Sequence, residues 1–174
     1  VRNWVIVYFG NFIGALSMVI WIYMTRQWSM NNNLVGAKAL LIANAKVGLP
    51  FSVAFSRGIL CNALVCLAIW LCMGGRSVTD KILSILFPIT AFVALGFEHS
   101  IANMYFIPIG MLLKNNAAVL EGATAMAGKV NDFSHLTVRG LLVNNLLPVT
   151  LGNIVGGGAL VGLVYWFVYL RVHR

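Results

Sequence analysis

Charged side chains are scarce in this sequence, and acidic ones are the scarcest. Only 9% of the 174 residues are charged, with four Asp and Glu against 12 Lys and Arg. Soluble domains carry about 25% charged residues, so the composition excludes an ordinary water-soluble domain. With 60% hydrophobic residues and a mean hydropathy of +0.89, the sequence predicts an all-α membrane protein whose immediate partner is a lipid bilayer.

Several other classes are excluded by patterns that do not occur. Cys61, Cys66 and Cys72 have no Cys-x-x-Cys spacing and no neighbouring histidine, which favours packing residues over a metal site. There is no basic stripe interleaved with aromatic residues, so we assign the net charge of +8 to membrane topology and anion attraction and not to nucleic acid. The sequence also has no His-Glu-x-x-His motif, and no Ser-His-Asp or Cys-His order suggests hydrolysis at membrane depth. We therefore expect no metal, no cofactor and no enzyme.

The hydrophobic runs predict one transmembrane domain over residues 1–174. Residues 34–47 are apolar but too short to span a bilayer and predict an interfacial or vestibule helix, whereas 114–145 predict a long polar loop. Because the sequence opens on Val1, without Met and already at the edge of a span, we expect a piece of a longer protein. The predicted spans cover about 4–24, 58–73, 81–94 with 99–113 as one broken helix, and 147–170.

The run from Lys81 to Leu113 is interrupted by polar residues at its centre. At a rise of ~1.5 Å per residue, one straight helix of this length would overshoot a ~30 Å hydrocarbon core by about half. Two half-helices fit better, and Gly96 stands where the break begins. Glu98 and His99 follow it, and ionisable side chains at this depth are expected to face protein or a water-filled path.

His99 is the main candidate for a pathway residue. A lone histidine in an apolar run is usually a satisfied core residue, but here Glu98 precedes it and Asn103 lies one helical turn beyond. An imidazole can donate a hydrogen bond and exchange a proton near neutral pH. Protonation would remove much of the cost of bringing an anion to a dry centre, so we favour pathway function over core packing.

Two further polar residues keep two interpretations each. Lys46, at the end of the short helix over 34–47, is either a solvated loop lysine or a charge that faces the path. Asn62, near one end of the second span, can simply bond a neighbouring helix, whereas the resemblance given below implies that it lines the path. The sequence pattern alone does not decide between them.

A short internal repeat links the first and last spans. Residues 10–14, GNFIG, match residues 152–156, GNIVG. This placement predicts two inverted halves of three spans each, with a further helix and a second broken helix expected before Val1. The basic residues around Arg76 and in the tail 171–174 predict that this turn and the C-terminus lie in the cytoplasm.

Four segments carry a resemblance to a known family: AFVALGFEHSIANMYFIPIG, NALVCLAIW, FSHLTV and PVTLGNIVGGG. Together they resemble the formate/nitrite transporter family, and most closely its formate channels, over the whole chain. The resemblance implies an aquaporin-like helical bundle with inverted repeats, a homopentamer, and one anion pore per protomer in the bacterial inner membrane. It also implies a role for each candidate residue: a substrate pathway of His99, Asn62, Asn103, Phe92 and Lys46, supported structurally by Glu98, Gly96 and Asn153.

Within that pathway, the resemblance implies that His99 is the central histidine, Phe92 the hydrophobic constriction and Lys46 the charge that attracts anions. The chain departs from the family pattern because the first two helices are missing and because Leu95, beside the break, is bulkier than expected. We predict a channel for small monovalent anions, formate first, in which the anion shares a proton with His99. Nitrite or hydrosulfide is the second choice of substrate, and a non-transporting membrane anchor subunit is the alternative from another class.

Overall fold

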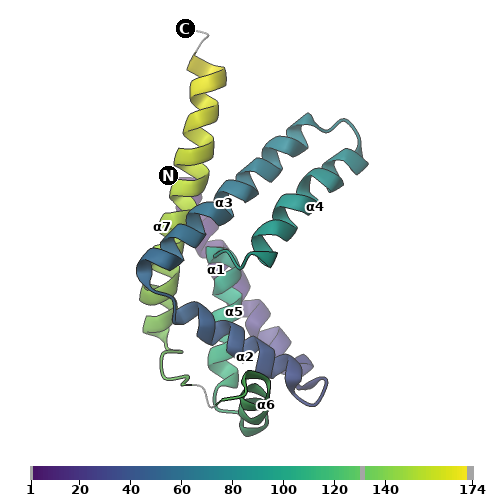
Figure 1. The fold of residues 1–174 in the computed structure, drawn as a ribbon, viewed down its shortest axis with the longest axis vertical. Coiled ribbons are helices and arrows are strands. Elements are labelled where there is room, and N and C mark those ends of the chain that lie inside the picture. The colour runs from purple at the N-terminus through teal and green to yellow at the C-terminus, as the bar shows by residue number, and fades with distance from the viewer. Residues whose placement is uncertain (1, 130–131, 172–174) are drawn as a thin grey trace. The chain divides into compact units, whose positions relative to one another are not determined.

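The computed structural model describes residues 2–129 and 132–171, and every regular element in this part of the chain is a helix (Figure 1). The predicted all-α class is confirmed. His173 and the rest of the basic tail beyond Arg171 lie outside the described residues. The helices in chain order are α1 Arg2–Met24, η1 Gln27–Ser29, α2 Leu34–Val47, α3 Phe51–Gly74, α4 Val78–Ala94, α5 Ser100–Leu113, α6 Ala117–Ala127, η2 Gly140–Leu146, α7 Leu147–Ile154, η3 Val155–Leu163 and η4 Trp166–Leu170.

Within residues 2–129 and 132–171, three helical stretches are long and apolar enough to cross a membrane: α1, α3 and the continuous run Gly140–Leu170. In that run η2, η3 and η4 are π-helical, whereas α7 is α-helical. Pro148 lies just after η2, and because proline has no N–H and its ring presses on the carbonyl four residues earlier, it accounts for the widened turns there.

The contacts divide the chain into two compact units. The first comprises Val1–Pro50 and Ile101–Leu146, and the second comprises Phe51–Ser100 and Leu147–Arg174. In the first unit α2 lies against α6 (Figure 1), and it also contacts η2. Its core is made of fully buried aliphatic side chains contributed by α2, α5, α6 and the segment before η2: Leu40, Met104, Ile107, Leu113, Val119 and Leu136.

The second unit is built on α3, which packs against α4, α7 and η3. The crossing of α3 and α7 is close because glycines meet there. A side-chain carbon on Gly58 would lie 2.8 Å from the Val149 carbonyl oxygen, and one on Gly152 would lie 3.1 Å from the Gly58 Cα. At the other end of α3 the Trp70 ring stacks on Tyr165 with centroids 4.0 Å apart. Small residues therefore set the approach of these two helices.

Three features differ from the sequence expectation. The last apolar helical run begins at Gly140, whereas the expected span begins at about 147. The helix α3 begins at Phe51, directly after Pro50, whereas the expected span begins at about 58. The interpretation of 114–145 as loop also misses α6. Asn116 accepts a hydrogen bond from the Val119 N–H at 3.1 Å, which starts this helix. Its apolar face is too short for a hydrophobic signal in sequence but is buried in the first unit through Val119 and Ala123.

Candidate functional site

The helix break lies in the second unit, between α4 and α5. The last residue of α4 is Ala94, and Gly96 adopts a left-handed conformation with φ of +65°, which a residue with a side chain resists. The backbone is then non-helical until α5 begins at Ser100. The break predicted from Gly96 and the polar cluster is therefore present, and α5 begins a new helical N-terminus directly after it.

Asn153 holds both sides of this break with one side chain. Its Oδ1 accepts a hydrogen bond from the Ser100 N–H at 3.0 Å, and its Nδ2 donates to the Glu98 carbonyl at 3.0 Å. The same Nδ2 also donates to the Gly58 carbonyl on α3 at 2.9 Å. Because Asn153 is only 8% exposed, these bonds satisfy backbone groups that have little access to water.

Asn62 reinforces the same junction. Its Nδ2 donates to the Asn153 carbonyl oxygen at 2.6 Å, from α3 to α7. Glu98 itself is 2% exposed, and its N–H reaches the Arg57 carbonyl at 3.4 Å. The structure thus brings together three residues that the sequence analysis treated separately, and it gives Asn62 the helix-bonding contact that was one of its two interpretations.

His99 stands beside Phe92 within the break. The two rings are stacked, with centroids 5.9 Å apart and planes 25° apart, and both side chains are half-buried. Phe92 comes from α4 and His99 from the segment just before α5, so the break turns the imidazole toward the aromatic ring. An apolar ring directly beside an imidazole combines a hydrophobic surface with a group that can donate a hydrogen bond or a proton.

In the first unit, three polar residues far apart in sequence are linked. Asn103, fully buried on α5, donates from Nδ2 to the Asn145 Oδ1 at 2.8 Å. Asn145, also fully buried, donates from its own Nδ2 to the Lys46 carbonyl at 2.9 Å. Sequence reasoning missed Asn145. Its only signal was the pair of asparagines at 144 and 145 in an otherwise apolar run.

Lys46 lies at the C-terminal end of α2 and is half-buried. Its ammonium nitrogen is 5.8 Å from the centroid of the Phe106 ring on α5, within the range of a cation–π contact. Phe106 also lines a groove of about 490 Å³ whose wall includes Lys38, about two turns before Lys46 on α2. Phe106 is therefore shared by two lysines of α2: Lys46 lies over its ring, and Lys38 lines the same groove as Phe106.

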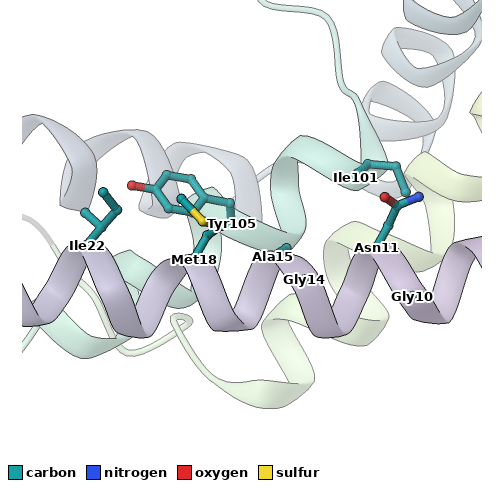
Figure 2. A pocket seen from close by; sticks show the side chains of 8 residues that line it. All are labelled: Gly10, Asn11, Gly14, Ala15, Met18, Ile22, Ile101 and Tyr105. Carbon is teal, nitrogen blue, oxygen red and sulfur yellow. The ribbon is translucent and has the colours of Figure 1, made fainter.

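A second groove of about 400 Å³ runs along α1 (Figure 2). Figure 2 shows Asn11 directed toward Ile101, and Tyr105 above Met18. None of the predicted pathway residues lines this groove. Gly10 and Asn11 of the repeated motif do, and a side-chain carbon on Gly10 would meet nothing within 4 Å. The copy of the repeat at 152–156 thus packs closely against α3, whereas a side-chain carbon on either glycine of the copy at 10–14 would meet nothing within 4 Å.

Substituting Gly152 by alanine is expected to destabilise the protein, because the added carbon would collide with the Phe55 carbonyl and lie 3.1 Å from the Gly58 Cα. Gly158→Ala is the control, since a carbon there meets nothing within 4 Å. Thermal unfolding in detergent should show a lower midpoint for Gly152→Ala alone. Equal midpoints for the two variants would contradict the close α3–α7 crossing.

No three His, Cys, Asp or Glu side chains gather to form a metal-binding cluster in residues 2–129 and 132–171. The second unit holds α4 and the break that follows it, with an ionisable pair, Glu98 and His99, whose backbone is bonded by Asn153. Together with the three long apolar stretches, this defines a multi-pass helical membrane protein with the broken-helix geometry that transporters and channels use.

The profile of the formate/nitrite transporter family matches residues 1–167. The chain belongs to this family, as its sequence motifs predict. It is 46% identical over 170 residues to the formate channel FocA of Escherichia coli K12, covering 98% of this chain and 59% of that protein. The formate channel FocA of Haemophilus influenzae is 39% identical over 163 residues, and the match covers 94% of this chain and 57% of the Haemophilus protein.

Solved structures agree with the assignment. A pentameric formate channel with formate bound superposes with a TM-score of 0.85 at 43% sequence identity, over 98% of this chain and 66% of that one. An ion channel of the same family superposes with a TM-score of 0.68 at 32% identity, over 92% of this chain and 56% of that one. The chain therefore has the family fold, and it spans about 60% of the length of the curated relatives that it matches.

Proposed function

We propose that the protein is a channel for small monovalent anions, with formate as its substrate, and that His99 shares a proton with the anion at the helix break. The observation that carries the substrate is the match to a formate channel with formate bound, at 43% identity over nearly the whole chain. The stack of His99 on Phe92 supports the mechanism. The proposal assigns this chain to a homopentamer in a bacterial inner membrane, by analogy with the pentameric relative.

The physical problem for such a channel is the cost of taking a carboxylate out of water. An isolated ionised group in an apolar medium is strongly disfavoured. In the proposed mechanism Phe92 narrows the path and keeps it dry, and the neighbouring imidazole donates a hydrogen bond or its proton to the formate oxygen. The N-terminal turn of α5 begins at Ser100, next to His99, and its backbone dipole adds attraction for a negative charge.

The other candidate residues take supporting parts in this proposal. Asn153 and Asn62 keep the break in one geometry, Gly96 allows the turn and Glu98 is the buried anchor. Asn103, four residues after His99 in the sequence, is assigned to the path, and its amide donates to Asn145. The pathway set of the proposal is His99, Asn62, Asn103, Phe92 and Lys46.

The test is flux of formate through liposomes that contain the complete polypeptide. We expect rapid formate equilibration that empty liposomes lack. Competition in the same assay with nitrite and with hydrosulfide ranks the alternative substrates, since each is a small weak-acid anion that meets the same barrier. If the protein is a non-transporting anchor subunit, none of the three anions crosses faster than in empty liposomes, and the proposal fails.

Lys46→Ala is expected to raise the half-saturating formate concentration severalfold while changing the maximal flux little, because a charge near the mouth raises the local anion concentration. Salt should weaken this advantage, since exposed charges are screened over about 8 Å at physiological ionic strength. The measurement is flux against formate concentration at low and high salt. Lys81→Ala, an exposed lysine of α4, is the control, and equal behaviour of the two variants would remove Lys46 from the pathway.

A further inference from the structure

The end of α2 presents a specific hydrogen-bonding problem. The last four carbonyl groups of a helix have no partner inside that helix. The Asn44 carbonyl accepts from the Gly48 N–H at 3.1 Å. Two residues later, the Lys46 carbonyl would need a donor from residue 50, and residue 50 is a proline without an N–H. The donor that the structure supplies instead is the Asn145 side chain, at 2.9 Å.

The position of Asn145 in a π-helical segment places its side chain in the interior, where it reaches the Lys46 carbonyl. It lies in the π-helical segment η2, ahead of Pro148. Its neighbour Asn144 is exposed, whereas Asn145 is fully buried. The amide has one acceptor and one donor group, and the structure uses both: Oδ1 takes the Asn103 amide from α5, and Nδ2 gives to Lys46 on α2.

We propose that Asn145 is a positioning residue for Lys46: it fixes the end of α2 against α5, so that the Lys46 ammonium stays beside the Phe106 ring. The expected effect of Asn145 on transport rests on the proposed function, in which Lys46 attracts the anion. The positioning itself is independent of transport. Buried hydrogen bonds in apolar surroundings tolerate little displacement, so the amide bridge defines where the lysine side chain begins.

The discriminating variant is Asn145→Asp in the complete polypeptide. The carboxylate has almost the same shape and still accepts from Asn103, but it has no donor for the Lys46 carbonyl. Asn144→Asp, next in sequence and exposed, is the matched control for adding the same charge. If Asn145→Asp fails to assemble, Asn145→Ser repeats the test with a polar group too short to reach both partners.

The first readout is amine labelling of lysines, followed by mass spectrometry. Losing one hydrogen bond to the Lys46 backbone should speed labelling of Lys46 by about three- to tenfold, while Lys38, exposed on the same helix, serves as the internal standard. Asn144→Asp should leave both rates unchanged. A Lys46 rate that is equal in the Asn145 and Asn144 variants overturns the inference, whether or not the protein conducts formate.

The second readout separates positioning from general destabilisation. Asn145→Asp should raise the half-saturating formate concentration as Lys46→Ala does, and the double variant should behave like Lys46→Ala alone, since the two act through one group. An additive double variant would show that Asn145 does not act through Lys46. If the unaltered protein shows no formate flux, the proposed function is wrong. The labelling experiment still tests the positioning role in that case, because it does not depend on transport.

Discussion

Replacing His99 by phenylalanine is expected to lower formate flux roughly 10- to 100-fold, because a hydrogen bond to a charged group contributes about 1.5–3 kcal/mol. Phenylalanine keeps a flat ring that can stack on Phe92, so the change removes the donor and the proton and leaves the packing. The same substitution should abolish the pH dependence of the remaining flux, since the imidazole proposed to exchange a proton with formate is then gone. The measurement is flux into liposomes between about pH 5 and 8, the range in which histidine titrates.

His135→Phe is the matched control for this experiment. His135 is fully outside the predicted spans and exposed, so its removal should leave both the rate and the pH profile intact. A His99→Phe protein whose flux follows the same pH profile as the unaltered protein would remove the proton-sharing role. If that unchanged pH profile is accompanied by a low flux, His99 acts only as a packing residue of the constriction.

Replacing Asn153 by leucine is expected to destabilise the protein by about 3 kcal/mol or more, because each buried group left without its partner costs about 1–3 kcal/mol. The backbone groups of Ser100, Glu98 and Gly58 all depend on this amide. We expect a strongly lowered thermal midpoint and loss of assembled protein on size-exclusion chromatography in detergent.

Asn153→Asp refines the prediction, because the carboxylate still accepts from the Ser100 N–H and loses both donated bonds. Its loss of stability should fall between the unaltered protein and Asn153→Leu. Asn144→Leu, at an exposed position in the same helical run, controls for the change of residue type. If Asn153→Leu melts like the Asn144 variant, the break is held by other contacts.

Composition and local chemistry carried the prediction of the fold class. The shortage of charge predicted a membrane protein, and Gly96 with the polar cluster at Glu98 and His99 predicted the broken helix, since few other sequences interrupt an apolar run in this way. The motifs predicted the family. These features are local or compositional, so they remain visible without knowledge of which segments meet.

The parts that could not be predicted depend on contacts between distant segments. Asn145 acquires its position from the π-helical turns ahead of Pro148 and from partners 42 and 99 residues away, and no periodicity in the sequence signals either. The short helix α6 depends on burial against α2 and not on its own hydrophobicity. For Asn62 the spacing left path and helix contact open. Its bond to the Asn153 carbonyl became visible only with the structure.

The most direct test of the central claim is a high-resolution structure of the complete polypeptide in lipid with formate. The account predicts a water-filled path reaching the break and formate within hydrogen-bond distance of the His99 imidazole, beside the Phe92 ring. An imidazole enclosed by side chains, with no cavity leading to it from either face of the membrane, would contradict it.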